Sequence, residues 1–242
     1  MNTVLTDVMY LDYNAIALKT INNNLKSVHH FLGLMVGGGI MKEKVHDQMV
    51  TRTRALLEDA LLELIEEKGF DGITIKDLTE KAGLNRGTFY LHYRDKYDLM
   101  EKVQEDILHG FLNILLQLSP FTALEYFSMN RPYPAMVQIF QYLKDHGRIL
   151  KVLLGPKGDP AFPQKMKMII SNNFSKKLID NLVNIPEDVS IAKEYMPAIG
   201  TAVNFGVIEQ WLENGMPHSP EEMAMVYFRI IKLLNSISQT LK

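Results

Sequence analysis

The chain of 242 residues contains no cysteine. Without thiols it can build no disulfide scaffold, no thiolate metal site and no cysteine nucleophile. Long apolar runs are also missing, because the longest candidate, residues 31–41 (FLGLMVGGGIM), is short and broken by glycines. Asp7 and Asp12 precede that run, which argues against a signal peptide. We therefore expect a protein of the cytoplasm that makes no use of a membrane.

Signatures of catalysis are equally scarce. The seven histidines show neither H-x-x-x-H nor H-E-x-x-H spacing, and the chain has no G-x-S-x-G, Walker loop or dinucleotide fingerprint. We therefore expect no enzyme, no catalytic residue, no metal and no cofactor. A strong charge of one sign is missing too, since the formal net charge is −2. Any binding of nucleic acid must then depend on a local basic patch.

Apolar residues recur at helical spacing over most of the chain, and no strand pair stands out, so we expect an all-α protein. The cap and stop residues of each segment set its expected ends. The predicted helices cover residues 51–68, 74–82, 85–93, 95–118, 134–146, 149–154, 164–183, 191–213 and 219–241, with a loop at 155–163.

The first 40 residues lack such periodicity and are expected to be an extension of the folded protein. Gly37 to Gly39 stand just ahead of Met41, and every glycine codon begins with GG. A purine-rich tract just ahead of an ATG resembles a ribosome-binding site read in frame, so residues 1–40 are expected to be a mis-called start or disordered. A real N-terminal arm with DNA or partner contacts is the alternative. The remainder divides into a helix-turn-helix domain at 45–97 and a helical domain at 98–242.

Two short predicted helices, 74–82 and 85–93, have the size and spacing of a helix-turn-helix. In that motif the second helix enters the major groove of DNA. Gly87 costs about 0.5–1 kcal/mol inside a helix relative to alanine, but it would let the backbone approach DNA. The hydroxyls of Thr88 and Tyr90 are suited to phosphate or thymine contacts. Phe89 and Tyr93, four residues apart, are expected to form the buried side.

Lys96 occupies an unusual position for a cation. It lies at a helix start, where the positive end of the helix dipole disfavours a positive charge, and a bound phosphate would relieve the conflict. Residues 74–96 contain five basic and three acidic residues, 5 − 3 = +2. Arg52 and Arg54 would enlarge this patch. The bland alternatives are a solvated Lys96 and a Gly87 that serves only packing.

The run GFDGITIKDLTEKAGLNRGTFYLHYRDKYDLMEKV resembles the DNA-binding domain of TetR-family transcriptional regulators over about residues 51–103. The resemblance implies a homodimer that represses transcription from a pseudo-palindromic double-stranded DNA operator until a small-molecule effector binds the C-terminal domain. It implies phosphate contacts at Thr74, Tyr90, His92 and Lys96, and base-facing positions at Lys76, Arg86, Gly87 and Thr88. The segments NRPYP, DHGRILKVLLGPKGDPAF and WLENGMPHSPEEMA resemble a C-terminal domain of the Bacillus/Firmicutes type.

Two helices near the C-terminus are suited to dimerisation. Ala198, Ala202 and Gly206 form a stripe of small residues, and the last helix carries a wide apolar face. Packed against a two-fold copy they would form a four-helix bundle. The expected interface residues are Ala198, Ala202, Gly206, Tyr227, Ile231 and Leu234. These faces could instead close the core of a single chain. For the whole protein, the alternative to a regulator is a helical adaptor or small-molecule-binding protein whose helix-turn-helix does not bind DNA.

Overall fold

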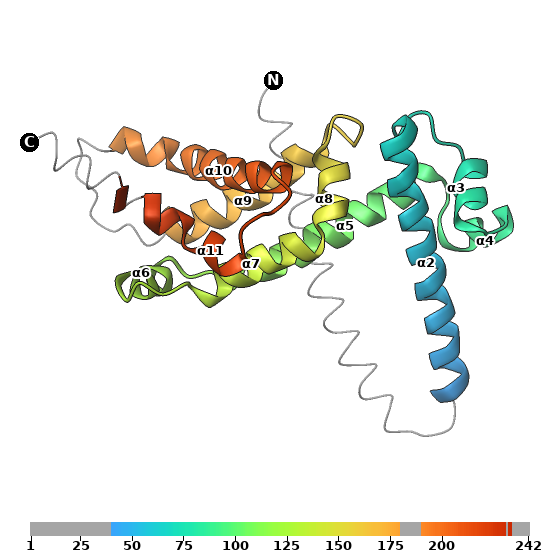
Figure 1. Cartoon of the computed structure of the whole chain (residues 1–242), viewed down its shortest axis with the longest axis horizontal. Helices are drawn as coiled ribbons and strands as arrows, with labels where there is room; N and C mark the ends of the chain where they lie inside the picture. The colour runs from blue at the N-terminus through green and yellow to red at the C-terminus, as the bar shows by residue number, and fades with distance from the viewer. Residues whose placement is uncertain (1–39, 180–189, 231, 234–242) are drawn as a thin grey trace, which may run out of the picture. The chain divides into compact units, whose positions relative to one another are not determined.

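The computed structural model describes residues 40–179, 190–230 and 232–233, and every regular element in that part of the chain is a helix (Figure 1). The all-α prediction is therefore confirmed. The chain divides into two compact units between His109 and Gly110. The division falls inside helix α5, Lys96–Leu115. None of the helices described is long and apolar enough to cross a bilayer.

The first unit is built on helix α2, Ile40–Lys68. Helices α3 (Ile75–Ala82) and α4 (Arg86–His92) form the helix-turn-helix, with α3 packed against both α2 and α4. Apolar side chains from α2, α3, α4 and the start of α5 make up the core of this unit. The least exposed among them are Leu57, Leu61, Ile65, Leu78, Phe89 and Leu99. Burial of these side chains sets the orientation of α4, the helix expected to meet DNA.

Helix α2 begins earlier than expected. It starts at Ile40 rather than near Thr51, and its N-terminal part extends past α3 and α4 in Figure 1. The sequence predicted no helix there because that segment lacks an apolar stripe, and Asp47, Gln48 and Met49 are indeed exposed. Once a helix has been nucleated, residues with good helix propensity can extend it one residue at a time without a buried face. The prediction failed because it relied on periodicity alone.

In the part of the chain that the structure describes, the second unit contains helices α6 to α11 and a further helical stretch at 226–230. Helix α9 packs along α10, and α11 packs against α7. Trp211, the only tryptophan of the chain, is buried with its ring edge-on to Phe140 at a centroid distance of 5.3 Å. Gly110 makes room for Tyr142, because a Cβ at Gly110 would overlap the tyrosine ring. The bounds are α6, Pro120–Ser128; α7, Pro134–Asp145; α8, Gly147–Leu154; α9, Phe162–Ile179; α10, Ser190–Glu213; and α11, Pro220–Ala224.

Two features of this unit differ from the prediction. Helix α6 was not expected, although Ser119 caps it by accepting a hydrogen bond from the Thr122 amide and Pro120 occupies its first turn. The last predicted helix is interrupted, because α11 ends at Ala224 and Met225 forms a turn before helix resumes at 226–230. The expected start of that helix is confirmed, since Ser219 and Glu222 form a capping box. Its expected end, and residues 1–39, lie outside the described residues.

Candidate nucleic-acid interface

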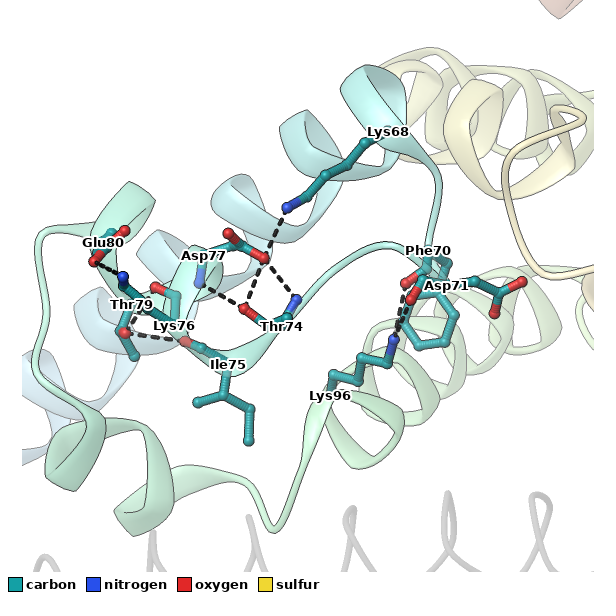
Figure 2. Close-up of polar contacts among 10 residues, drawn as sticks. All are labelled: Lys68, Phe70, Asp71, Thr74, Ile75, Lys76, Asp77, Thr79, Glu80 and Lys96. Carbon is teal, nitrogen blue, oxygen red and sulfur yellow. Dashed lines mark hydrogen bonds and ion pairs between the residues drawn. The ribbon is translucent and has the colours of Figure 1, made fainter.

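The N-terminus of α3 is held by a reciprocal capping box (Figure 2). The Asp77 carboxylate accepts hydrogen bonds from the Thr74 backbone amide at 2.8 Å and the Thr74 hydroxyl at 2.7 Å, and the Asp77 amide donates back to that hydroxyl. The Lys68 ammonium lies 2.7 Å from the same carboxylate. Lys68 and then the Thr74 donors hold the pKa of Asp77 well below its usual range. Thr74 is exposed at the start of α3, as expected, but its hydroxyl hydrogen is already donated inside the protein.

The turn between α3 and α4 uses residues suited to each backbone position. Gly83 ends α3 in the left-handed region, with φ of +66°, a conformation that favours glycine. Asn85 then caps α4 and accepts hydrogen bonds from the Thr88 amide at 2.8 Å and the Thr88 hydroxyl at 3.1 Å. A Cβ at Gly87 would lie 3.1 Å from the Asn85 side-chain oxygen. Gly87 therefore leaves room for the cap of α4, which is a role within the protein and agrees with the alternative that this glycine serves packing.

Helix α4 has one buried side and one exposed side. Phe89 and Tyr93 are 0% and 3% exposed with ring centroids 5.8 Å apart, which confirms the predicted anchors. Burial raises the pKa of Tyr93 to about 12. Arg86 and Gly87 are exposed on the other side, Tyr90 is 57% exposed, and Thr88 is partly exposed. The structure thus presents these base- and phosphate-facing candidates on a single short helix.

His92 lies at the end of α4 and is partly exposed. Burial lowers its pKa, and the positive charges of Arg54 and Lys102 lower it further. The ring is therefore neutral at pH 7, when it retains one N–H donor. Such a ring can still donate a hydrogen bond to a phosphate oxygen.

Lys96 has partners inside the protein that the sequence did not reveal (Figure 2). Its ammonium donates to the carbonyl oxygens of Phe70 at 3.1 Å and Asp71 at 2.9 Å, and it lies 4.9 Å from the centre of the Phe70 ring. These contacts hold the turn between α2 and α3 against the start of α5, and we refer to them as the Lys96 clamp. An ammonium has three hydrogens, and the clamp uses two of them. The clamp explains a cation at a helix start without invoking a phosphate.

Several cations of the predicted basic patch have carboxylate partners. Lys76 lies 3.6 Å from Glu80, and Lys81 lies 3.0 and 2.7 Å from Glu63 and Glu67. These two carboxylates raise the pKa of Lys81, and Glu67 has the larger effect. The Arg86 guanidinium, by contrast, makes no hydrogen bond or ion pair to another residue in the described part of the chain. The exposed side of α4 therefore carries a guanidinium available to an external partner.

The expected dimer residues of α10 lie on an open face. Ala198, Ala202 and Gly206 are exposed, and a Cβ at Gly206 would meet no atom within 4 Å. Larger apolar residues of the same helix, Tyr195 and Ile199, are 57% and 58% exposed. Within the described chain the small-residue stripe therefore does not close the core of its own unit, which was the alternative interpretation. We call these five residues the α10 face.

The other expected dimer residues are less informative. Tyr227 is partly buried, and burial raises its pKa. The remaining two, Ile231 and Leu234, lie outside the described residues.

One exposed residue of α4, Leu91, was not predicted from the sequence to belong to the interface. Leu91 is 82% exposed, the largest value among the exposed large apolar side chains that the structure describes. Its position next to Tyr90 and four residues after Gly87 could have revealed it, because residues four apart share a helix face.

Comparison with known proteins finds a matching family model in each of the two parts of the chain. A family model described as "Bacterial regulatory proteins, tetR family" matches residues 57–103, and one described as "Transcriptional regulator C-terminal region" matches residues 130–233. The uncharacterised HTH-type transcriptional regulator YxbF of Bacillus subtilis is 28% identical over 207 residues. The alignment covers 85% of this chain but 51% of YxbF, so the chain spans about half the length of that relative.

Similarity over a shorter stretch is found to a tetracycline repressor. The class D tetracycline repressor protein of Escherichia coli is 37% identical over 60 residues, which cover 25% of this chain and 28% of the repressor. Among solved structures, a transcriptional regulator from Aquifex aeolicus VF5 superposes with a TM-score of 0.51 at 16% identity, over 75% of this chain and 99% of that protein. At this identity the likeness concerns the fold alone.

Proposed function

Because the chain belongs to the TetR family of transcriptional regulators, we propose that it binds a specific operator in double-stranded DNA and represses transcription from it. The observation that carries this proposal is the two-sided α4. Phe89 and Tyr93 anchor the helix in the core, while Arg86, Gly87 and Tyr90 lie exposed on the opposite side. A helix anchored in this way can enter the major groove without losing its packing. The family is one of regulators and not of enzymes, as expected from the sequence.

The exposed groups divide into two kinds of DNA contact. Base-edge contacts are assigned to Lys76, Arg86, Gly87 and Thr88, and phosphate contacts to Thr74, Tyr90, His92 and Lys96. The unpaired guanidinium of Arg86 supports a base contact, since arginine can donate two parallel hydrogen bonds to guanine. Phosphate contacts by Thr74 and Lys96 would use groups that already bind within the protein, so these two residues would serve both the fold and the DNA.

We further propose that the regulator acts as a homodimer joined through the α10 face. The stripe of Ala198, Ala202 and Gly206 would allow two helices to approach closely, and Ile199 and Tyr195 would supply apolar area to bury. A two-fold dimer presents two copies of α4, which calls for a pseudo-palindromic operator with half-sites about one helical turn apart or somewhat more.

The C-terminal unit is the proposed site of release by a small-molecule effector. Support comes from its match to a regulator C-terminal region at residues 130–233. One relative that matches a quarter of this chain is named a tetracycline repressor, so a small molecule and repression both stand in its name.

Selection of binding sequences from a randomised pool of DNA duplexes tests the function directly. We expect wild-type protein to enrich one pseudo-palindromic sequence. Arg86→Ala should then lose about 1–3 kcal/mol of discrimination between that operator and scrambled DNA, because a good base contact is worth that much. Arg131→Ala, an exposed arginine of the second unit, is the matched control and should change nothing.

The outcomes separate the alternatives. Equal loss of affinity for operator and scrambled DNA would reassign Arg86 to the backbone. A wild-type protein that enriches no sequence would favour the helical adaptor.

A further inference from the structure

Leu91 is a large apolar side chain at the part of the first unit that is proposed to meet DNA. At 82% exposure it gains almost nothing from packing, whereas Phe89, two residues earlier, is fully buried. A single exposed leucine is ordinary on a protein surface. Its place on α4 is what singles this one out, because every other feature of that helix is accounted for by anchoring, capping or a proposed DNA contact.

The register of α4 puts Leu91 among the groups that would face the base edges. Residues four apart are neighbours on a helix, so Leu91 lies beside Gly87, and Tyr90 lies beside Arg86. Helical side chains lean toward the N-terminus. Leu91 therefore covers the turn that contains Gly87, where no side chain competes for space. The exposed side of α4 thus carries the Arg86 guanidinium and, next to it on the helix surface, the apolar side chain of Leu91.

Leucine has no hydrogen-bond donor or acceptor, so it cannot bind phosphate or read a polar base edge. In the major groove only thymine offers an apolar group, its C5-methyl. We propose that Leu91 is a specificity-determining residue that reads a thymine in each half-site by packing against this methyl group. The proposal rests on the proposed function, since it requires α4 to lie in the major groove of an operator.

Deoxyuridine supplies the probe, because it differs from thymidine only by the missing methyl. The operator selected by wild-type protein is synthesised with each thymine of a half-site replaced in turn by uracil. Wild-type and Leu91→Ala proteins are then titrated against every duplex. Alanine favours helix formation and the side chain is exposed, so the variant should fold like wild type. Leu124→Ala, a 63% exposed leucine of α6, is the matched control.

We expect one thymine at which uracil weakens wild-type binding about fourfold, the value of burying one methyl-sized group. At that position uracil should have no effect on Leu91→Ala, whereas all other positions should affect both proteins equally. The Leu124→Ala protein should behave as wild type throughout.

Two results would overturn the assignment. One is that every uracil has the same effect on both proteins, and the other is that Leu91→Ala weakens operator and scrambled duplexes alike. Failure of the proposed function is a different result, because wild-type protein would then select no operator at all.

Discussion

Removing the Lys96 ammonium should destabilise the first unit as well as weaken DNA binding. Lys96→Met keeps most of the aliphatic stem and deletes the three donors together with the charge. The variant loses the hydrogen bonds to the Phe70 and Asp71 carbonyls and the contact with the Phe70 ring. The turn between α2 and α3 is then no longer held against α5.

The size of the loss follows from these contacts. A hydrogen bond from a charged donor contributes about 1.5–3 kcal/mol, and the bond to Phe70 is partly buried while the bond to Asp71 is exposed to water. The cation–π contact at an exposed site adds about 0.5–1 kcal/mol. Water can replace part of the exposed bond, so we expect the free energy of unfolding to fall by about 2 kcal/mol.

Urea unfolding followed by far-ultraviolet circular dichroism measures this loss. Lys76→Met is the matched control, because Lys76 lies on the exposed side of α3 and its ammonium lies 3.6 Å from the Glu80 carboxylate in an exposed pair. Exposed pairs contribute about 0–1 kcal/mol, so the control should stay close to wild type. Equal stability of the Lys96→Met and Lys76→Met proteins would refute the clamp.

A salt titration of operator binding separates the clamp from the phosphate contact proposed for the same group. A lost phosphate contact lowers the slope of log affinity against log salt by about one. We expect Lys96→Met to show both the lower stability and the lower slope. An unchanged slope would leave Lys96 as a purely structural residue.

Three further predictions concern other parts of the chain. Ala202→Glu should give monomers in sedimentation, because it introduces a charge into the α10 face, and an intact dimer would place the interface elsewhere. Gly158→Ala should lower the melting temperature, because the added Cβ would overlap the carbonyl oxygen of Val152. An unchanged melting temperature would show that the turn can shift to make room. His92 should reduce stability in acid: its pKa is lowered in the folded chain, so the unfolded chain binds the proton more readily as pH falls through about 6.5. Unfolding measured between pH 7 and 5 should therefore depend less on pH in His92→Gln, and identical pH profiles would contradict this.

Features encoded within a few residues were predictable from the sequence. In the Thr74–Asp77 capping box and the Asn85 cap, each side chain binds a backbone amide three positions away. Gly83 adopts the left-handed conformation because it has no side chain, which is also a local property. Helix α6 escaped prediction because its cap, Ser119, has Thr122 at the third position where Ser219 has a glutamate. Both helices begin with a serine cap followed by proline, but α6 lacks the glutamate that completes the capping box of α11.

Features that depend on distant parts of the chain were not predictable. The dipole argument identified Lys96 as unusual, but its partners lie 25 and 26 residues earlier, and no local pattern connects them. The spacing of Ala198, Ala202 and Gly206 indicated a shared face, yet only the folded unit could reveal that this face is open.

The single tryptophan makes the two units spectroscopically distinguishable. Trp211 is 3% exposed and belongs to the second unit, while the first unit contains tyrosines and no tryptophan. Its fluorescence therefore follows loss of packing around Phe140, whereas circular dichroism follows the helices of the whole chain. Coincident transitions would mean that the chain unfolds as one cooperative system. If the circular dichroism signal of the helices begins to fall before the fluorescence changes, the first unit melts first. Its stability can then be measured without separating it from the rest.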